Sequence, residues 1–455
     1  MQKVTVFFWL SLFAMFGDAR FALGEIAASD SNVERGTKFY DQGRYDDAIK
    51  AFAEAIQRDP RNVAAYVGRA RAYGQRGDLK RSQADCNEAI RLDPQCAGAY
   101  RCRALNYCDM GDTQKALDAA NQAVRLAPNT ASVLSCRAAV YDSCGKVDLA
   151  IRDAAEVVRL SPNVADSFYN RGVLYAKTHD YPRALADYNE AIRLNRNCIE
   201  ALVNRSSAYQ ALGNYEQAIA DATEAIRLDP KCGLAYYNRS TAYKKKHQYE
   251  GAISDASQAI RLSGKDVRGY RLRASIFLES SECEKALADC NAALRIAPGD
   301  IRTMGLRSSI YGSLGRYEEA IAAATTVIRQ SSDNSGKVTG FCFRGLAYNG
   351  NSQPSEAEAD LKEAIRLDPQ CVLAYDGLGR LCARQDRADE AIAAFSKLIG
   401  LLPQHARFYY VFRAQMYERK GDRQKAADDY ATAKKLGYKQ GEPFPRLPFI
   451  VDVDD

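Results

Sequence analysis

Residues 199–232 read IEALVNRSSAYQALGNYEQAIADATEAIRLDPKC and contain two apolar patterns of helical period. Apolar residues recur at three- and four-residue steps from Leu202 to the glycine at 213, and again from Ile219 to Ile226. This spacing places apolar side chains on one face of a helix, and glycine followed by asparagine favours a turn. The stretch therefore predicts two short amphipathic helices joined by a tight turn.

The pattern of this stretch recurs along most of the chain in successive units of equal length. When Ile199 is place 1 of its unit, proline recurs at place 32 and alanine at place 20, and only Ser82 interrupts the alanine series. Three extra residues at 335–337 and one more before the last unit shift the frame, which gives twelve units over about residues 29–440. The prolines are Pro60, Pro94, Pro128, Pro162, Pro230 and Pro298, and the alanines are Ala48, Ala116, Ala150, Ala184, Ala218, Ala252, Ala286, Ala320, Ala357, Ala391 and Ala426.

This frame resembles that of the tetratricopeptide repeat family. The features of the family in residues 199–232 are Ser206, Tyr209, Gly213, Ala218, Ala225 and Pro230. The resemblance implies an all-α fold, a right-handed superhelical solenoid of tandem helix-turn-helix repeats whose first helices line a concave groove. It also implies a protein that binds other proteins or peptides. We expect repeats one to nine at 29–334, an insertion at 335–337 and repeats ten to twelve at 338–440.

Residues 1–24 have the pattern of an export signal. Lys3 precedes an apolar run from Val4 to Phe16, and small residues that a signal peptidase accepts follow at Ala19, or at Ala22 and Gly24. The run is shorter than the roughly 20 residues that a membrane-spanning helix needs. We expect a cleaved signal at 1–24, a linker at 25–28 and a periplasmic or secreted protein with no stable membrane insertion. An uncleaved membrane anchor is the alternative.

Charge and motifs argue against nucleic-acid binding and catalysis. A net charge of +6 over 455 residues is mild and forms no basic stripe, so we expect no nucleic-acid partner. His179, His247 and His405 lie in separate predicted turns, and the sequence has no P-loop, no G-x-S-x-G and no complete G-x-G-x-x-G. We therefore expect a protein that is not an enzyme and needs no cofactor. The sequence leaves the oligomeric state open.

Thirteen cysteines raise the question of a metal or disulfide framework. Cys96, Cys102 and Cys108 are evenly spaced, but six steps along a helix leave the side chains of the last two pointing about 120° apart. The sequence has no C-x-x-C, with which structural zinc sites usually begin. Cysteines at the same place of adjacent repeats lie about 10 Å apart, too far for a disulfide. We interpret the cysteines mainly as small packing residues and expect no metal site.

Arginine at place 7 and aspartate at place 23 form a correlated pattern. Eleven units have the arginine, and eight of these also have the aspartate, as in Arg205 with Asp221 and Arg239 with Asp255. The unit with Leu378 and Ala394 at these places lacks both. We interpret the pattern as ion pairs that join the two helices of one repeat, with the charged atoms within about 4 Å.

Asn170, Asn204 and Asn238 occupy place 6 of three consecutive first helices. Because an amide both donates and accepts hydrogen bonds, such a row can bind the backbone of an extended peptide. The arrangement is similar to the asparagine ladders of armadillo proteins. A solvated polar face is the alternative interpretation.

Five cations are expected at inward-facing places near these asparagines. They would favour an acidic peptide by electrostatic attraction, although an ordinary charged surface is the alternative. The five are Lys244, Lys245, Arg268, Arg271 and Arg302.

The last segment, residues 441–455, contains Pro443, Pro445 and Pro448 and departs from the repeat. We expect its apolar residues to cap the solenoid, with a tail that a partner binds as the alternative.

The whole sequence favours a non-enzymatic scaffold that binds proteins or extended peptides in the groove. A regulatory or substrate-recruiting subunit of an enzyme, or of an envelope or polysaccharide assembly complex, is the alternative function.

Overall fold

The computed structural model describes residues 31–439, and the expected signal peptide at 1–24 and C-terminal cap at 441–455 lie outside the described residues. Within 31–439 the chain forms 24 α-helices, one short 3₁₀ helix and no strand. The all-α class predicted from the sequence is therefore confirmed. The described chain divides after Pro230 into two compact units, each considered by itself below.

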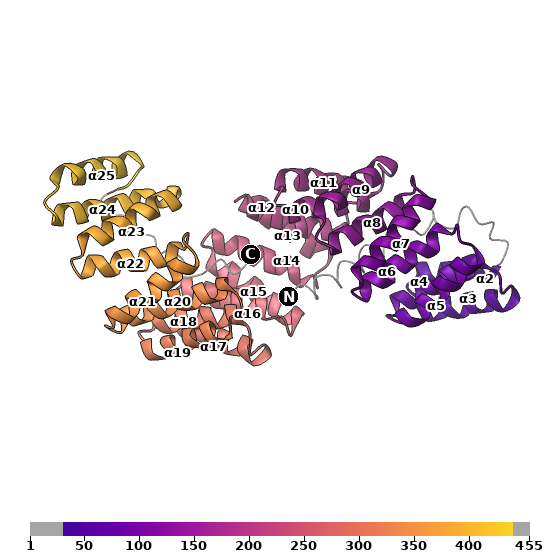
Figure 1. The fold of residues 1–455 in the computed structure, drawn as a ribbon, viewed down its shortest axis with the longest axis horizontal. Helices are drawn as coiled ribbons and strands as arrows, with labels where there is room; N and C mark the ends of the chain where they lie inside the picture. Colours follow the sequence, from indigo (N-terminus) through magenta and orange to yellow (C-terminus); the bar gives the residue numbers. More distant parts are fainter. Residues whose placement is uncertain (1–30, 440–455) are drawn as a thin grey trace. The chain divides into compact units, whose positions relative to one another are not determined.

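Unit 1 contains helices α2 to α13, which follow one another side by side (Figure 1). Their bounds are α2 Ser31–Asp41, α3 Tyr45–Arg58, α4 Val63–Gln75, α5 Leu79–Leu92, α6 Ala97–Asp109, α7 Thr113–Leu126, α8 Ala131–Ser143, α9 Val147–Leu160, α10 Ala165–Lys177, α11 Tyr181–Leu194, α12 Ile199–Ala211 and α13 Tyr215–Leu228.

Unit 2 contains α14 to α25, again packed in chain order. Their bounds are α14 Gly233–Lys245, α15 Tyr249–Ser263, α16 Val267–Glu279, α17 Cys283–Ile296, α18 Ile301–Ser313, α19 Tyr317–Gln330, α20 Asn334–Gly350, α21 Pro354–Leu367, α22 Val372–Arg384, α23 Ala388–Leu401, the 3₁₀ helix η1 Pro403–His405, α24 Ala406–Arg419 and α25 Arg423–Lys435.

Even-numbered helices are the first helices of hairpins, and odd-numbered helices are the second. A residue with positive φ ends each first helix, because a left-handed residue stops the helix and reverses the chain. Glycine takes this position in seven hairpins, and other residues take it in five. The glycines are Gly43, Gly77, Gly111, Gly145, Gly213, Gly315 and Gly421, and the other residues are His179, His247, Ser281, Ser352 and Asp386.

The extra residues at 335–337 lie in the first turn of α20, which makes this helix 17 residues long. The side chain of Asp333 accepts a hydrogen bond from Gly336 N at 2.8 Å and so caps the helix. The three residues therefore extend a helix rather than form a separate loop.

Small residues at places 8 and 20 let the two helices of a hairpin cross closely. The alanines at place 20 are between 0% and 3% exposed, so they form the centre of the core. Ser206 at place 8 donates its hydroxyl to the carbonyl of Ala218 at place 20, at 2.8 Å. Ser82, which interrupts the alanine series, donates instead from place 20 to the carbonyl of Ala70 at place 8, at 2.6 Å. Ser82, the exception in the sequence, thus joins the same two places by a hydrogen bond, but its donor lies on the second helix instead of the first.

The side chain at place 24 is large in the hairpins that have glycine at place 8. A Cβ added to Gly36 would lie 2.7 Å from the ring of Phe52, and one added to Gly379 would lie 2.7 Å from Phe395. Gly172 has the same relation to Tyr188. The missing side chain on the first helix leaves the space that the aromatic ring on the second helix fills in these three hairpins.

Candidate binding surface

The first helices lie closer to their neighbours than the second helices do. In unit 1, α4 packs on α2 and on α6, and in unit 2, α20 packs on α18 and on α22. Among the described residues no two second helices of one unit make a comparable contact. Because the closer row lies on the inside of a curved array, the first helices form the inner face of each unit, and they carry all eight candidate residues.

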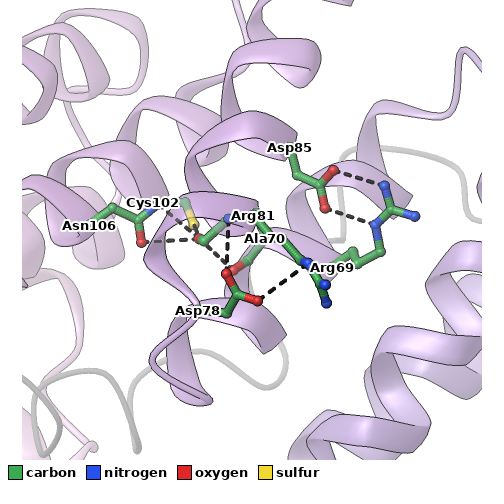
Figure 2. Close-up of polar contacts among 8 residues, drawn as sticks. Arg69, Ala70, Asp78, Arg81, Asp85, Cys102 and Asn106 are labelled. Carbon is green, nitrogen blue, oxygen red and sulfur yellow. Dashed lines mark hydrogen bonds and ion pairs between the residues drawn. The ribbon is translucent and has the colours of Figure 1, made fainter.

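Eight arginine–aspartate pairs join first to second helices, as the sequence predicted. In each pair Nε and Nη2 donate to the two carboxylate oxygens at 2.6 to 2.9 Å, and Figure 2 shows Arg69 with Asp85 in this arrangement. The hydrogen bonds from Arg69 to Asp85 raise the pKa of Arg69 above its ordinary value. Bidentate pairs of this kind fix the helix crossing and leave no charge for a ligand.

Three place-7 arginines lack the aspartate. Arg35 pairs instead with Glu54 on α3. Arg103 and Arg307 face Ala119 and Ala323 at place 23, and the Nε atom of each is buried without a hydrogen-bond partner. At these two arginines one buried donor therefore lacks the carboxylate that accepts from it in the other members of the series.

The asparagine row divides between the two units. Asn170 on α10 is half-buried and makes no hydrogen bond within the described residues. Asn204 on α12 donates Nδ2 to the hydroxyl of Tyr169 on α10, at 3.1 Å, which leaves its carbonyl oxygen available. Asn238 on α14 belongs to unit 2 and is 5% exposed. The structure thus brings Asn204 beside the helix that carries Asn170.

Two of the five expected cations are buried in unit 2. Lys244 is 8% exposed; its ammonium lies 3.2 Å from Glu279 and donates to Ser275 Oγ at 3.0 Å. Arg271 is 7% exposed and lies 2.9 Å from Asp300. Their charges are neutralised inside the protein. In contrast to the expectation from the sequence, they are therefore not available to an acidic ligand.

The other three cations differ in their surroundings. Arg268 is exposed and forms an ion pair at 2.7 Å with Asp266, two residues before it. Lys245 and Arg302 each have an interaction partner within the protein. An anionic ligand at this part of unit 2 would therefore compete with internal contacts, which lowers the net attraction.

Unit 1 has acidic groups on its first helices that we did not predict. Burial raises the pKa of Asp109 on α6 to about 6. On α10, burial and the nearby carboxylate of Glu200 raise the pKa of Asp166. Sequence periodicity could not identify these residues, because they occupy different places and only their burial distinguishes them.

A second polar cluster lies between α5 and α6, and Figure 2 shows two of its members, Asn106 and Cys102. Asn106 is 3% exposed and donates Nδ2 to Ser82 Oγ at 2.8 Å. The same amide lies 3.7 Å from the sulfur of Cys86. These partners satisfy the buried amide, so the cluster stabilises the core and offers no open position to a ligand.

The described residues contain no group of three or more histidine, cysteine or acidic side chains that could hold a metal ion. No helix between residues 31 and 439 combines the length and apolar character needed to cross a membrane.

The structure is that of a protein built from tandem helical hairpins. Family models, all described as tetratricopeptide repeat, match residues 33–97, 237–301 and 344–406, residues 165–198, residues 199–232 and residues 301–334. Together they match more than half of the chain, which belongs to the tetratricopeptide repeat family. A model described as anaphase-promoting complex subunit 5 matches residues 99–143.

The chain is also similar to solved structures. A tetratricopeptide repeat protein from Parabacteroides merdae is 20% identical, with a TM-score of 0.45 over 55% of this chain and 98% of that chain. Yeast Tom70 is 16% identical, with a TM-score of 0.44 over 91% of this chain and 97% of that chain. A chain of the APC/C hetero-tetramer Cut9–Hcn1 is 13% identical, with a TM-score of 0.48 over 93% of this chain and 90% of that chain.

Completing the pair at Arg103 is expected to stabilise unit 1. Ala119→Asp supplies the missing carboxylate and should raise the local free energy of unfolding of α6 and α7 by about 1 kcal/mol, since a hydrogen bond to a charged group contributes this much or more. Amide hydrogen exchange of the two helices in the full chain measures the change. Ala119→Asn, which has the same size without the charge, should give a smaller gain. A lower protection in Ala119→Asp than in the parent would contradict the structural role of the pairs.

Asp109 predicts a pH dependence of stability. Its folded-state pKa lies above the unfolded value, so the native state keeps the proton and stability falls as pH rises from about 4 to about 6. Asp109→Asn should therefore increase the free energy of unfolding at pH 7 by about 1 kcal/mol, a value that allows for the partial exposure of Asp109, and so raise the melting temperature. The melting temperatures of the two proteins should converge near pH 4. Thermal unfolding of both proteins from pH 4 to 7 tests this, and parallel curves would show that Asp109 is not desolvated.

Proposed function

We propose that this protein is a non-enzymatic scaffold that binds an extended segment of another protein along the first helices. The observation that carries the proposal is that Asn170 makes no hydrogen bond within the described residues and that the adjacent first helix carries Asn204, whose carbonyl oxygen is not used by its bond to Tyr169. A donor and acceptor repeated along one face match the repeating N–H and C=O groups of an extended backbone. The tetratricopeptide repeat frame, which we propose comprises twelve units, supports a protein-binding role.

The ligand charge proposed from the sequence needs revision. Lys244 and Arg271 are neutralised by Glu279 and Asp300, so an acidic ligand would gain little from them. Recognition in unit 1 depends instead on hydrogen bonds to the backbone, which are insensitive to ligand sequence. We therefore propose a peptide defined by its extended conformation rather than by acidic residues.

Membership of a larger multi-chain assembly is a second candidate function. The observation that favours it is the match of residues 99–143, which span α6 to α8, to a family model for a subunit of the anaphase-promoting complex. Hydrogen-bonding and packing surfaces on helical hairpins serve subunit contacts as well as peptide contacts.

Replacing the two amides is expected to weaken peptide binding. Peptides selected from a displayed random library against the full chain should bind Asn170→Ala and Asn204→Ala each about 2- to 10-fold more weakly, because each loses about 0.5–1.5 kcal/mol of hydrogen bonding. Titration calorimetry measures the affinities of several unrelated peptides.

Two controls separate this effect from structural damage. Tyr169→Phe removes the hydroxyl that accepts from Asn204, so it reports the loss of the internal bond alone. Asn87→Ala changes an exposed amide on α5, a second helix, and should leave the affinity unchanged. Unaltered binding to both first-helix variants would exclude this face as the binding surface.

We also propose that the chain is exported and that residues 1–24 are removed. The support is the basic residue, the apolar run and the small residues in this segment. Mass spectrometry of the protein isolated from its native source should find an N-terminal peptide that begins close to residue 25. Intact protein retaining Met1 and extracted only with detergent would instead support an uncleaved anchor.

A further inference from the structure

Cys342 on α20 and Cys371 before α22 bring two sulfur atoms together at 3.4 Å. All thirteen cysteines are free thiols in the structure. Cys342 is 1% exposed, whereas Cys371 is partly exposed and is the N-cap residue of α22. Both side chains adjoin the core cluster that includes Leu361 and Ala374. One thiol of the pair is therefore within reach of a reagent in solution, and the other lies directly behind it.

The contact joins two positions that the fold itself holds together. Cys342 occupies place 5 and Cys371 place 34 of one repeat. Arg271 and Asp300 occupy the same two places in an earlier repeat of unit 2, and they form the buried ion pair at 2.9 Å. Since unrelated side chains meet at these places, the proximity of the two sulfur atoms follows from the repeat geometry.

The surroundings of the two sulfur atoms give them different chemical roles. The pKa of Cys371 is lowered because Cys342 hydrogen-bonds to its sulfur and because backbone N–H groups of Ala374 and Leu373 point toward it, which together outweigh the effect of burial. The pKa of Cys342 is raised by that hydrogen bond and by burial. Since the thiolate is the nucleophile in exchange reactions, Cys371 is suited to react first and Cys342 second.

We propose that Cys342 and Cys371 form a thiol–disulfide exchange site that accepts a disulfide bond from low-molecular-weight disulfides. To form the bond, the sulfur atoms must approach from 3.4 Å to about 2.05 Å. The new bond would join the first helix of one hairpin to the start of the next. This activity is independent of peptide binding.

The exchange balances with glutathione disulfide as the oxidant. The Cys371 thiolate attacks one sulfur of glutathione disulfide, which forms a mixed disulfide and releases one glutathione thiolate. The Cys342 thiol then loses its proton and attacks Cys371 Sγ, which releases the second glutathione thiolate. Two protein thiols are oxidised, one disulfide is reduced to two glutathione thiols, and the two protons from the protein end on these products.

The test uses the reduced full chain incubated with glutathione disulfide, quenched in acid, alkylated after unfolding and mapped by peptide mass spectrometry. We expect a cross-linked peptide pair containing Cys342 and Cys371, with the other thiols alkylated. Cys342→Ser should stop at the mixed disulfide and retain glutathione on Cys371. Cys371→Ser should retain no glutathione on Cys342, because that thiol is buried.

Three comparisons separate this site from general thiol reactivity. Cys290→Ser removes a fully buried thiol whose pKa burial raises to about 12, and it should cross-link like the parent. Val67→Cys places a thiol at place 5 opposite Cys96 at place 34, and we expect a second cross-link there. Oxidation should also raise the melting temperature of the parent by several °C, but not that of Cys342→Ser.

Alkylation of both Cys342 and Cys371 after treatment of the folded parent would overturn the proposal. So would a cross-link between Cys86 and Cys102 in place of the expected pair, since these two cysteines also lie in one cluster but are both buried. Retention of glutathione equally at many cysteines of Cys342→Ser would likewise show that Cys371 has no special reactivity.

Discussion

The close crossing of two helices at places 8 and 20 is the constraint on which the rest of the structure depends. A hairpin whose helices approach this closely can hold only small residues at the crossing, and the alanines at place 20 are accordingly buried without exception. Where place 8 is glycine, the second helix supplies a large side chain that fills the space, a phenylalanine opposite Gly36 and Gly379. The space at the crossing is thus filled from one helix or the other, because close packing tolerates neither a void nor an overlap.

The arginine–aspartate pairs add direction to this packing. Apolar contact alone leaves two helices free to slide, whereas a guanidinium group that donates two parallel hydrogen bonds fixes their register. Arg69 and Asp85 illustrate the arrangement: both are largely removed from water, and each satisfies the other. In these eight hairpins the charges at places 7 and 23 neutralise each other within the protein.

Periodicity predicted the features that recur in most repeats, and it missed those that occur in single repeats. The helical hairpins, the buried alanines and the ion pairs recur at the same places of successive units, so a single sequence reveals them. Positive φ at His179 or Ser281 was not predictable, because neither residue type requires that conformation. The burial of Lys244 and Arg271 also escaped prediction, since it depends on Glu279 and Asp300 at other places of the frame.

The contact between places 5 and 34 shows how such differences give individual repeats their own chemistry. The backbone brings the two positions together in two repeats of unit 2, and different pairs of side chains occupy them. An arginine and an aspartate there become a buried ion pair, as at Arg271 and Asp300, and two cysteines become adjacent thiols, as at Cys342 and Cys371. The repeat frame therefore determines which positions lie in contact, and the residues that occupy those positions determine the chemistry of each contact.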